Sequence, residues 1–217
     1  MTPDLFADEP ALAGTFTRLG VAAVVLRGFA LPHVAALWPA LQAVLDQAPF
    51  RHMVTPGGQR MQVALTNCGA MGWASDRQGY RYTTRDPASG RPWPALPAAF
   101  AELAHAAAAT AGFEGFAPDA CLINRYRPGT RLSLHQDRNE RDFSAPIVSV
   151  SLGLPGVFLW GGLQRGDRAE RVPLFHGDVV VWGGADRLRF HGVAPVPEGF
   201  HPLTGGERIN FTFRRAA

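Results

Sequence analysis

Lysine is absent from this sequence. All 21 basic residues are arginine, against 18 acidic residues, so the formal net charge is only +3 although the pI is about 9.4. The planar guanidinium of arginine binds phosphate bidentately and stacks on bases. The composition therefore permits a nucleic-acid partner without demonstrating one, since a genome biased toward arginine codons explains it equally well.

Cysteine is scarce, and long apolar runs are missing. The two cysteines, Cys68 and Cys121, stand far apart, which excludes a disulfide-stapled scaffold and favours free thiols in a reduced compartment. The first residues carry Asp4, Asp8 and Glu9 in place of an apolar run, so no secretory signal is visible. No apolar stretch is long enough to span a bilayer. We therefore expect a cytoplasmic protein with no membrane partner.

The chain is long enough for one domain with a sizeable core: it has 217 residues, of which 47% are hydrophobic and 18% charged. Residues 1–49 predict an N-terminal extension, with a strand at 21–26 and a helix over 31–48 that Pro39 should kink or divide. Residues 50–95 are rich in glycine, arginine, threonine and aromatics without a sustained period. Such a segment is typical of a functional or mobile part of a compact domain.

Residues 96–217 predict one helix followed by an all-β region. After Pro97, apolar residues fall on one helical face, and Gly112 ends the pattern. Further on, short apolar runs are separated by turn residues, at 121–123, 147–154, 157–160, 172–175, 179–182, 187–190 and 209–213. This spacing favours a β-sandwich or jelly roll. We expect an α+β fold, with a helical and loop-rich N-terminal half packed on a β-sandwich.

Three residues of the β half have the chemistry of a metal site. His135 and Asp137 are two positions apart, so on an extended strand they point to the same side, and His191 ends a distant apolar run. Two histidines and one carboxylate on one face of an ion are typical of non-haem iron(II) oxygenases, because open positions remain for co-substrate and oxygen. The motif alone is weak, and zinc hydrolases also use mixed His and carboxylate ligands.

The segment 208–214 raises the odds of an oxygenase. Strict alternation places Arg208, Asn210, Thr212 and Arg214 on one face of a strand and apolar residues on the other. An ordinary strand with one solvent-exposed face would show the same pattern without any functional role. Two arginines on that face also suit a dicarboxylate, which guanidinium groups bind through charge-assisted hydrogen bonds. Asn124 and Tyr126 share a face in the same manner.

Together these motifs resemble the bacterial AlkB proteins, a family of iron(II)- and 2-oxoglutarate-dependent dioxygenases that dealkylate nucleic acids. The motifs are Asn124-Arg125-Tyr126, His135-Gln136-Asp137, His191-Gly192 and the strand 208–214. The likeness covers nearly the whole chain, with further shared segments at 5–7, 50–51, 53–58, 66–69, 72–73, 118–126, 145–155 and 177–184. So long a set is far more specific than the metal motif itself.

The resemblance implies a double-stranded β-helix (jelly-roll) core and a set of site residues. Iron(II) would be bound by His135, Asp137 and His191. The co-substrate 2-oxoglutarate would contact Asn124, Tyr126, Arg208, Asn210 and Arg214. Residues 50–95 would form a nucleotide-recognition lid over the core of 96–217. The substrate nucleotide would meet Trp73, Tyr80, Arg81, Tyr82, Asn139 and Arg165.

The resemblance also implies the reaction. With O2 and 2-oxoglutarate as co-substrates, the enzyme would demethylate N-alkylated bases such as 1-methyladenine and 3-methylcytosine and release formaldehyde. The substrate would be single- or double-stranded DNA, with RNA as a further class, and the enzyme a monomer without an obligate protein partner. Asn139 departs from the family pattern, which has an acidic residue there. Because an amide donates as well as accepts hydrogen bonds, the lesion preference is open.

Three other readings stay open at the level of sequence. The same iron chemistry could hydroxylate a protein side chain or a lipid. The β-sandwich could be a catalytically silent nucleic-acid-binding module, although its ligand set and arginine strand are intact. A zinc hydrolase is the third alternative, but it has no obvious use for paired Arg208 and Arg214. Fold alone would not decide, because jelly rolls host many functions.

Overall fold

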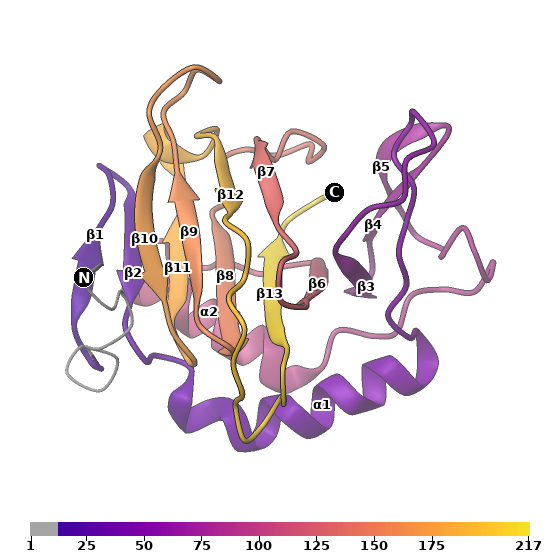
Figure 1. Cartoon of the computed structure of the whole chain (residues 1–217), viewed down its shortest axis with the longest axis horizontal. Helices are drawn as coiled ribbons and strands as arrows, with labels where there is room; N and C mark the ends of the chain where they lie inside the picture. The colour runs from indigo at the N-terminus through magenta and orange to yellow at the C-terminus, as the bar shows by residue number, and fades with distance from the viewer. Residues whose placement is uncertain (1–12) are drawn as a thin grey trace.

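The structure is a computed structural model that describes residues 13–217, and in it two antiparallel sheets pack face to face (Figure 1). In spatial order, the larger sheet consists of β1 (Phe16–Arg18), β2 (Ala23–Leu26), β11 (Val179–Trp182), β8 (Ile147–Gly153), β13 (Arg208–Arg214), β6 (Ala120–Tyr126) and β3 (Ala64–Gly69). The smaller sheet consists of β10 (Glu170–Leu174), β9 (Gly156–Trp160), β12 (His191–Val193) and β7 (Leu132–His135). The predicted α+β fold with a jelly-roll core is confirmed.

Two helices cover the outer face of the larger sheet. They are α1 (Val34–Gln47), preceded by the 3-10 turn η2 (Leu31–His33), and α2 (Ala98–Thr110). Pro39 lies inside α1 without dividing it. Leu37 on one side of the proline and Leu41 and Val44 on the other are buried in the same cluster, so packing holds the helix together across the missing N–H.

Residues 50–95 are more regular than the sequence predicts. They contain β3, which joins the larger sheet beside β6, and the hairpin of β4 (Gly72–Asp76) and β5 (Gly79–Thr83). Figure 1 places this hairpin beside the open edge of the jelly roll. The segment thus gives one strand to the core and one hairpin to the edge. The predicted extension 1–49 has its first twelve residues outside the described part of the chain.

The predicted strand at 187–190 is wrong. The 3-10 turn η3 (Gly184–Asp186) precedes it, and the next strand begins only at His191. Asp186 fixes the turn: its carboxylate accepts from the backbone N–H of Ala22 at 2.7 Å and from Arg189 Nη1 at 2.9 Å. These side-chain contacts, rather than a strand ladder, hold the segment, so the alternation of apolar and charged residues there does not mark a strand.

Alternation along the strands of the larger sheet divides the interior into two layers. On β13, the apolar residues Ile209, Phe211 and Phe213 face α1 and α2, in one cluster with Val148 and Val150 of β8. Between the two sheets, the cluster around Trp160 and Trp182 fills one end, as expected for tryptophans in apolar strands. At the other end the inward residues of β6, β8 and β13 are polar and buried. The space between the sheets therefore changes from apolar to polar along its length.

Candidate functional site

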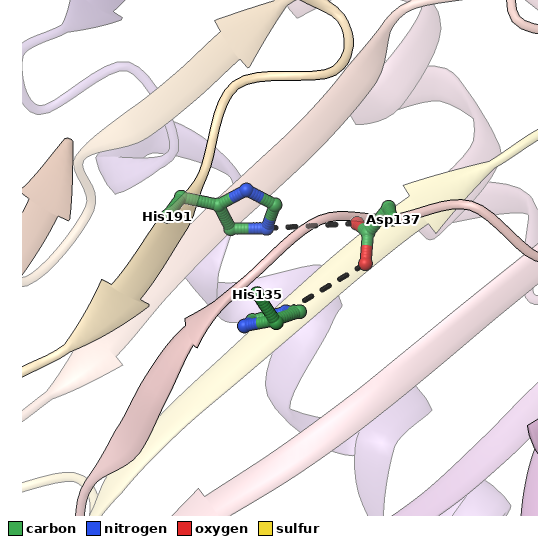
Figure 2. A group of neighbouring side chains, drawn as sticks. All are labelled: His135, Asp137 and His191. Carbon is green, nitrogen blue, oxygen red and sulfur yellow. Dashed lines mark ion pairs between the residues drawn. The ribbon is translucent and has the colours of Figure 1, made fainter. Parts of the chain in front are cut away.

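The three predicted metal ligands meet at the polar end of the space between the sheets. His135 ends β7 and His191 begins β12, and the two are direct partners in the antiparallel pairing of these strands. Figure 2 shows both imidazoles pointing at Asp137. Each Nε2 lies 3.7 Å from one carboxylate oxygen, and one ligand atom from each residue falls within 4.8 Å of the others.

Hydrogen bonds to the far side of each ring fix the tautomers. His135 Nδ1 lies 2.9 Å from the carbonyl of Ser133, and His191 Nδ1 lies 3.0 Å from the carbonyl of Arg189. A carbonyl oxygen only accepts, so each Nδ1 carries a proton, and in the neutral ring each Nε2 turns its lone pair toward Asp137. A backbone partner on the second nitrogen is the usual support of a metal-binding histidine.

The charge states of the site also suit a divalent metal. Burial, with a further contribution from His135, lowers the pKa of His191 to about 4, so this imidazole is neutral near pH 7. Burial alone would raise the pKa of Asp137, but Arg214 and then the two histidines hold it well below its usual range. Two imidazole nitrogens and one carboxylate are the donor set of a non-haem iron(II) site.

Gly192 allows the two ligand-bearing strands to come this close. The register of β7 and β12 shifts between His191 and Val193, as at a β-bulge. A Cβ at position 192 would lie 2.6 Å from the carbonyl oxygen of Leu132. Any side chain there would push β7 away and move His135 with it. The close approach of the two strands therefore requires a glycine directly after His191.

The residues expected to contact 2-oxoglutarate line the larger sheet opposite the metal ligands. Arg208 pairs across the strands with Tyr126, and Asn210 pairs with Asn124. Directly opposite residues share a face, so these four side chains form one buried polar patch. Asn210 Nδ2 donates to Ser149 Oγ at 2.8 Å and to the Val150 carbonyl at 3.0 Å.

Arg208 is a buried cation that forms no ion pair in the described part of the chain. Its relative exposure is 2%, and no ion pair of residues 13–217 includes it. Nη2 donates to Ser151 Oγ at 2.7 Å, but Nε makes no hydrogen bond within the described chain. Burial lowers the pKa of its guanidinium. A buried charge in this state costs free energy unless an anion arrives, so the residues present fit a bound carboxylate.

Arg214, also predicted to contact 2-oxoglutarate, lies at the other end of β13 beside the metal ligand Asp137. It donates from Nε and Nη2 to Asp137 Oδ2 at 2.9 and 2.6 Å. It also lies 3.4 Å from Glu140 Oε1, which accepts from the Tyr82 hydroxyl at 2.7 Å. Burial raises the pKa of Tyr82 well above its usual value, so the phenol stays protonated as a donor. This chain of contacts joins β5 to the metal ligand.

Arg187, which the sequence reading did not single out, holds the loop after the metal motif. Nη1 donates to the backbone carbonyl of Asp137 at 3.1 Å, and Nε donates to that of Ala145 at 3.2 Å. Nη2 lies 3.2 Å from Glu140 Oε2, and both side chains are almost fully buried. The serines 149 and 151 and Glu140 were missed as well. No short motif marks any of them, because each acts through contacts that only the fold brings together.

The predicted substrate residues divide into two groups. Trp73 and Tyr80, both on the β4–β5 hairpin, stack on each other with ring centroids 5.6 Å apart and an interplanar angle of 15°. Trp73 Nε1 also donates to Asn139 Oδ1 at 3.2 Å. Two arginines are otherwise occupied. Arg81 forms a two-point ion pair with Asp76, while Arg165 lies over the Phe190 ring and reaches the Leu134 carbonyl at 3.4 Å.

Comparison with known proteins decides the family. A model of the 2OG-Fe(II) oxygenase superfamily matches residues 22–214. The chain is 57% identical over 214 residues to the alpha-ketoglutarate-dependent dioxygenase AlkB of Salmonella typhimurium, covering 99% of this chain and 98% of that protein. The chain belongs to the AlkB family of 2OG-Fe(II) oxygenases. It is therefore an iron(II)- and 2-oxoglutarate-dependent dioxygenase, as the sequence predicted, with iron(II) and 2-oxoglutarate as its cofactor and co-substrate.

More distant members of the AlkB family agree with the fold. The solved structure of OsALKBH1 superposes with a TM-score of 0.80 at 27% identity, covering 93% of this chain and all of that one. Human nucleic acid dioxygenase ALKBH1 is 38% identical over 107 residues, which is 48% of this chain and 28% of that protein.

None of the helices between residues 13 and 217 is both long and apolar enough to cross a membrane.

Proposed function

We propose that this dioxygenase removes N-methyl groups from nucleic-acid bases, such as 1-methyladenine and 3-methylcytosine. The observation that carries the proposal is the stacked pair Trp73 and Tyr80, which a hydrogen bond from Trp73 ties to Asn139, two residues after Asp137. Aromatic faces bind bases by stacking, at about 1–3 kcal/mol per base. The name of the human relative, a nucleic acid dioxygenase, points to the same substrate class.

In this proposal His135, Asp137 and His191 hold iron(II), and Arg208 binds the far carboxylate of 2-oxoglutarate. When bound, the iron and 2-oxoglutarate supply an O2-derived oxidant while 2-oxoglutarate is converted to succinate and carbon dioxide. Arg214 fixes one oxygen of Asp137 and thereby the direction of the other. Asn124, Tyr126 and Asn210 complete the polar wall beside Arg208. Each residue positions a group or excludes water, and the oxidation belongs to the cofactor.

The oxidised carbon leaves as formaldehyde. One oxygen atom of O2 enters the methyl C–H bond, and the other ends in succinate. The resulting N-hydroxymethyl group loses formaldehyde: the electron pair of the broken C–N bond stays on the base nitrogen, and the proton of the hydroxyl is released to water. A base in a duplex cannot reach a buried metal site, so the nucleotide must be single-stranded or flipped out of the helix.

Residues 50–95 act as the nucleotide-recognition lid in this proposal, chiefly through the β4–β5 hairpin. Tyr82 anchors the hairpin to Glu140, while Tyr80 is 48% exposed and available to a nucleotide. Arg81 would have to leave Asp76 to meet a phosphate, whereas Arg165 is exposed at the rim. Residues 1–49 and 96–217 form the extension and the core. A cytoplasmic monomer acting on DNA, with RNA as a further substrate, completes the proposal.

The test is a demethylation assay. Protein loaded anaerobically with iron(II) is mixed with 2-oxoglutarate, O2 and single strands carrying 1-methyladenine or 3-methylcytosine, and mass spectrometry follows each strand. We expect the loss of one methylene mass, dependent on 2-oxoglutarate and absent in His135→Ala. Succinate without loss of the methyl group would contradict the proposal and favour the alternative, a hydroxylase of a protein or a lipid.

A further inference from the structure

An arginine-lined groove lies on the outer face of the smaller sheet, behind the strands that carry the metal ligands. It has a volume of about 520 Å³, with Leu134, Leu159 and Pro195 among its apolar lining residues and Arg131, Arg165 and Arg171 as its charged ones. The register explains the mixture. Leu159 is the direct partner of Arg171 on the neighbouring strand, and directly opposite residues share a face.

The groove and the metal site use opposite faces of the same strands. His135 and Leu134 are consecutive on β7, so their side chains point to opposite sides. On β9, Phe158 and Trp160 point into the core between the sheets, which leaves Leu159 outside. At the rim, Arg165 reaches the carbonyl of Leu134. Arg165, which is predicted to contact the substrate nucleotide, therefore also borders this groove.

The charge of the groove has one sign. No aspartate or glutamate is among its lining residues, and none of its three arginines forms an ion pair within residues 13–217. Glu170 is the direct partner of Trp160, an inward residue, and so belongs to the opposite face. Arg131 and Arg171 are exposed. Unpaired guanidinium groups beside an apolar floor suit a polymer of phosphates whose sugars and bases cover the floor.

We propose that this groove binds the nucleic-acid strand that flanks the target nucleotide, with phosphates on Arg131 and Arg171 and a sugar or base on Leu159. The inference rests on the proposed function, because the occupant is the same strand whose methylated base enters the metal site. It adds a binding surface outside that site, on the reverse of β7 and β12. Contacts of this kind fix position and affinity without reading sequence.

The test compares a long and a short substrate. A fifteen-nucleotide single strand with a central 1-methyladenine reaches from the metal site into the groove, whereas a trinucleotide with the same lesion does not. The variants are Arg171→Gln and the double variant Arg131→Gln/Arg171→Gln, with Arg18→Gln, an exposed arginine on β1, as the matched control. Both groove arginines are exposed, so the variants keep the fold.

We expect the double variant to raise KM several-fold for the long strand and to leave kcat/KM for the trinucleotide unchanged. The slope of log Kd against log salt for the long strand should become shallower by about 0.7 for each arginine removed. Arg18→Gln should match the unaltered protein on both substrates. If the double variant loses the same fraction of kcat/KM on both substrates, or loses none on either, the proposal that the groove binds the strand is refuted.

Failure of the proposed function has a different signature. If the unaltered protein demethylates neither substrate, the demethylase proposal fails whatever the groove does. Fluorescence anisotropy of an unmodified fifteen-nucleotide strand then tests the groove alone. A shallower salt slope in the double variant supports it, and an unchanged slope refutes it.

Discussion

Replacing Arg208 by methionine should make the ligand-free protein more stable and the ligand-bound protein less stable. The side chain is buried, lacks an anionic partner within residues 13–217 and leaves Nε without a hydrogen bond. Methionine has a similar length and no charge to desolvate. In the absence of 2-oxoglutarate, the unaltered protein is therefore destabilised by the desolvation of the Arg208 guanidinium, a term that the methionine variant lacks.

The magnitude follows from the contacts. Replacing buried charges by apolar side chains of similar volume stabilises proteins by up to about 4 kcal/mol. Against this, Ser151 loses the 2.7 Å hydrogen bond from Arg208, and an unsatisfied buried hydroxyl costs about 1–3 kcal/mol. We expect a net gain of about 1–2 kcal/mol, which raises Tm by about 2–8 °C in a chain of this size. Losing a buried ion pair to the ligand costs about 2–5 kcal/mol, which weakens 2-oxoglutarate binding about thirty-fold to several thousand-fold.

Thermal unfolding with and without 2-oxoglutarate measures both effects, with manganese(II) in place of iron to prevent turnover. At one hundred times Kd the ligand stabilises the unaltered protein by about 2.7 kcal/mol, whereas the variant, which binds it at least about thirty-fold more weakly, should gain about 0.9 kcal/mol or less. The higher Tm of the variant is therefore lost or reversed when the ligand is added. Arg127→Met is the control, since its side chain is 66% exposed and paired with Glu207. If Arg208→Met lowers the Tm of the ligand-free protein, the claim that Arg208 is an uncompensated buried charge is refuted.

Three further substitutions test other parts of the site and fold. Gly192→Ala places a Cβ 2.6 Å from the Leu132 carbonyl, so it should cost about 1–3 kcal/mol of stability and weaken manganese(II) binding, as measured by thermal unfolding and by metal titration; full metal affinity would contradict the steric argument. Arg187→Gln leaves a buried face of Glu140 unpaired and should cost about 3 kcal/mol in urea unfolding, while Arg187→Lys should recover only part of the loss. Burial, with a contribution from His201, lowers the pKa of His176 to about 4. Because the folded pKa lies below the unfolded value of 6.5, its stabilising contribution is complete above pH 6.5 and is lost as the pH falls toward 4; for this half-exposed side chain it amounts to about 1–2 kcal/mol, and urea unfolding of His176→Gln across this range should show a flatter pH dependence.

The sequence predicts those features that follow from local alternation. The polar face of 208–214 is visible because a strand alternates with a period of two; in the fold both faces of β13 are buried, the apolar residues against the helices. The spacing of His135 and Asp137 predicts a shared direction for the same reason, and the fold brings them together with His191. The resemblance to AlkB then joined these separate signals into one site.

The remaining features depend on tertiary contacts. Arg187 lies in a segment whose alternation predicts a strand, yet its side chain reaches back to the carbonyls of Asp137 and Ala145. Ser149 and Ser151 belong to an apolar run and become part of the site only because β8 lies beside β13. The hairpin at 72–83 contains residues typical of loops, so the sequence predicts no strands there. The stacking of Trp73 on Tyr80 follows from the pairing of β4 with β5 and not from any hydrophobic periodicity in the sequence.

β13 follows every other described strand in sequence, yet it lies inside the larger sheet between β6 and β8. During synthesis from the N-terminus, β6 and β8 therefore wait with unpaired edges until residues 208–214 emerge. Exposed edges of this kind invite pairing with other chains. The nascent protein therefore depends on the late insertion of one strand. A truncation before residue 208 would remove Arg208 and Arg214 and would also leave the facing edges of β6 and β8 unpaired and prone to aggregation.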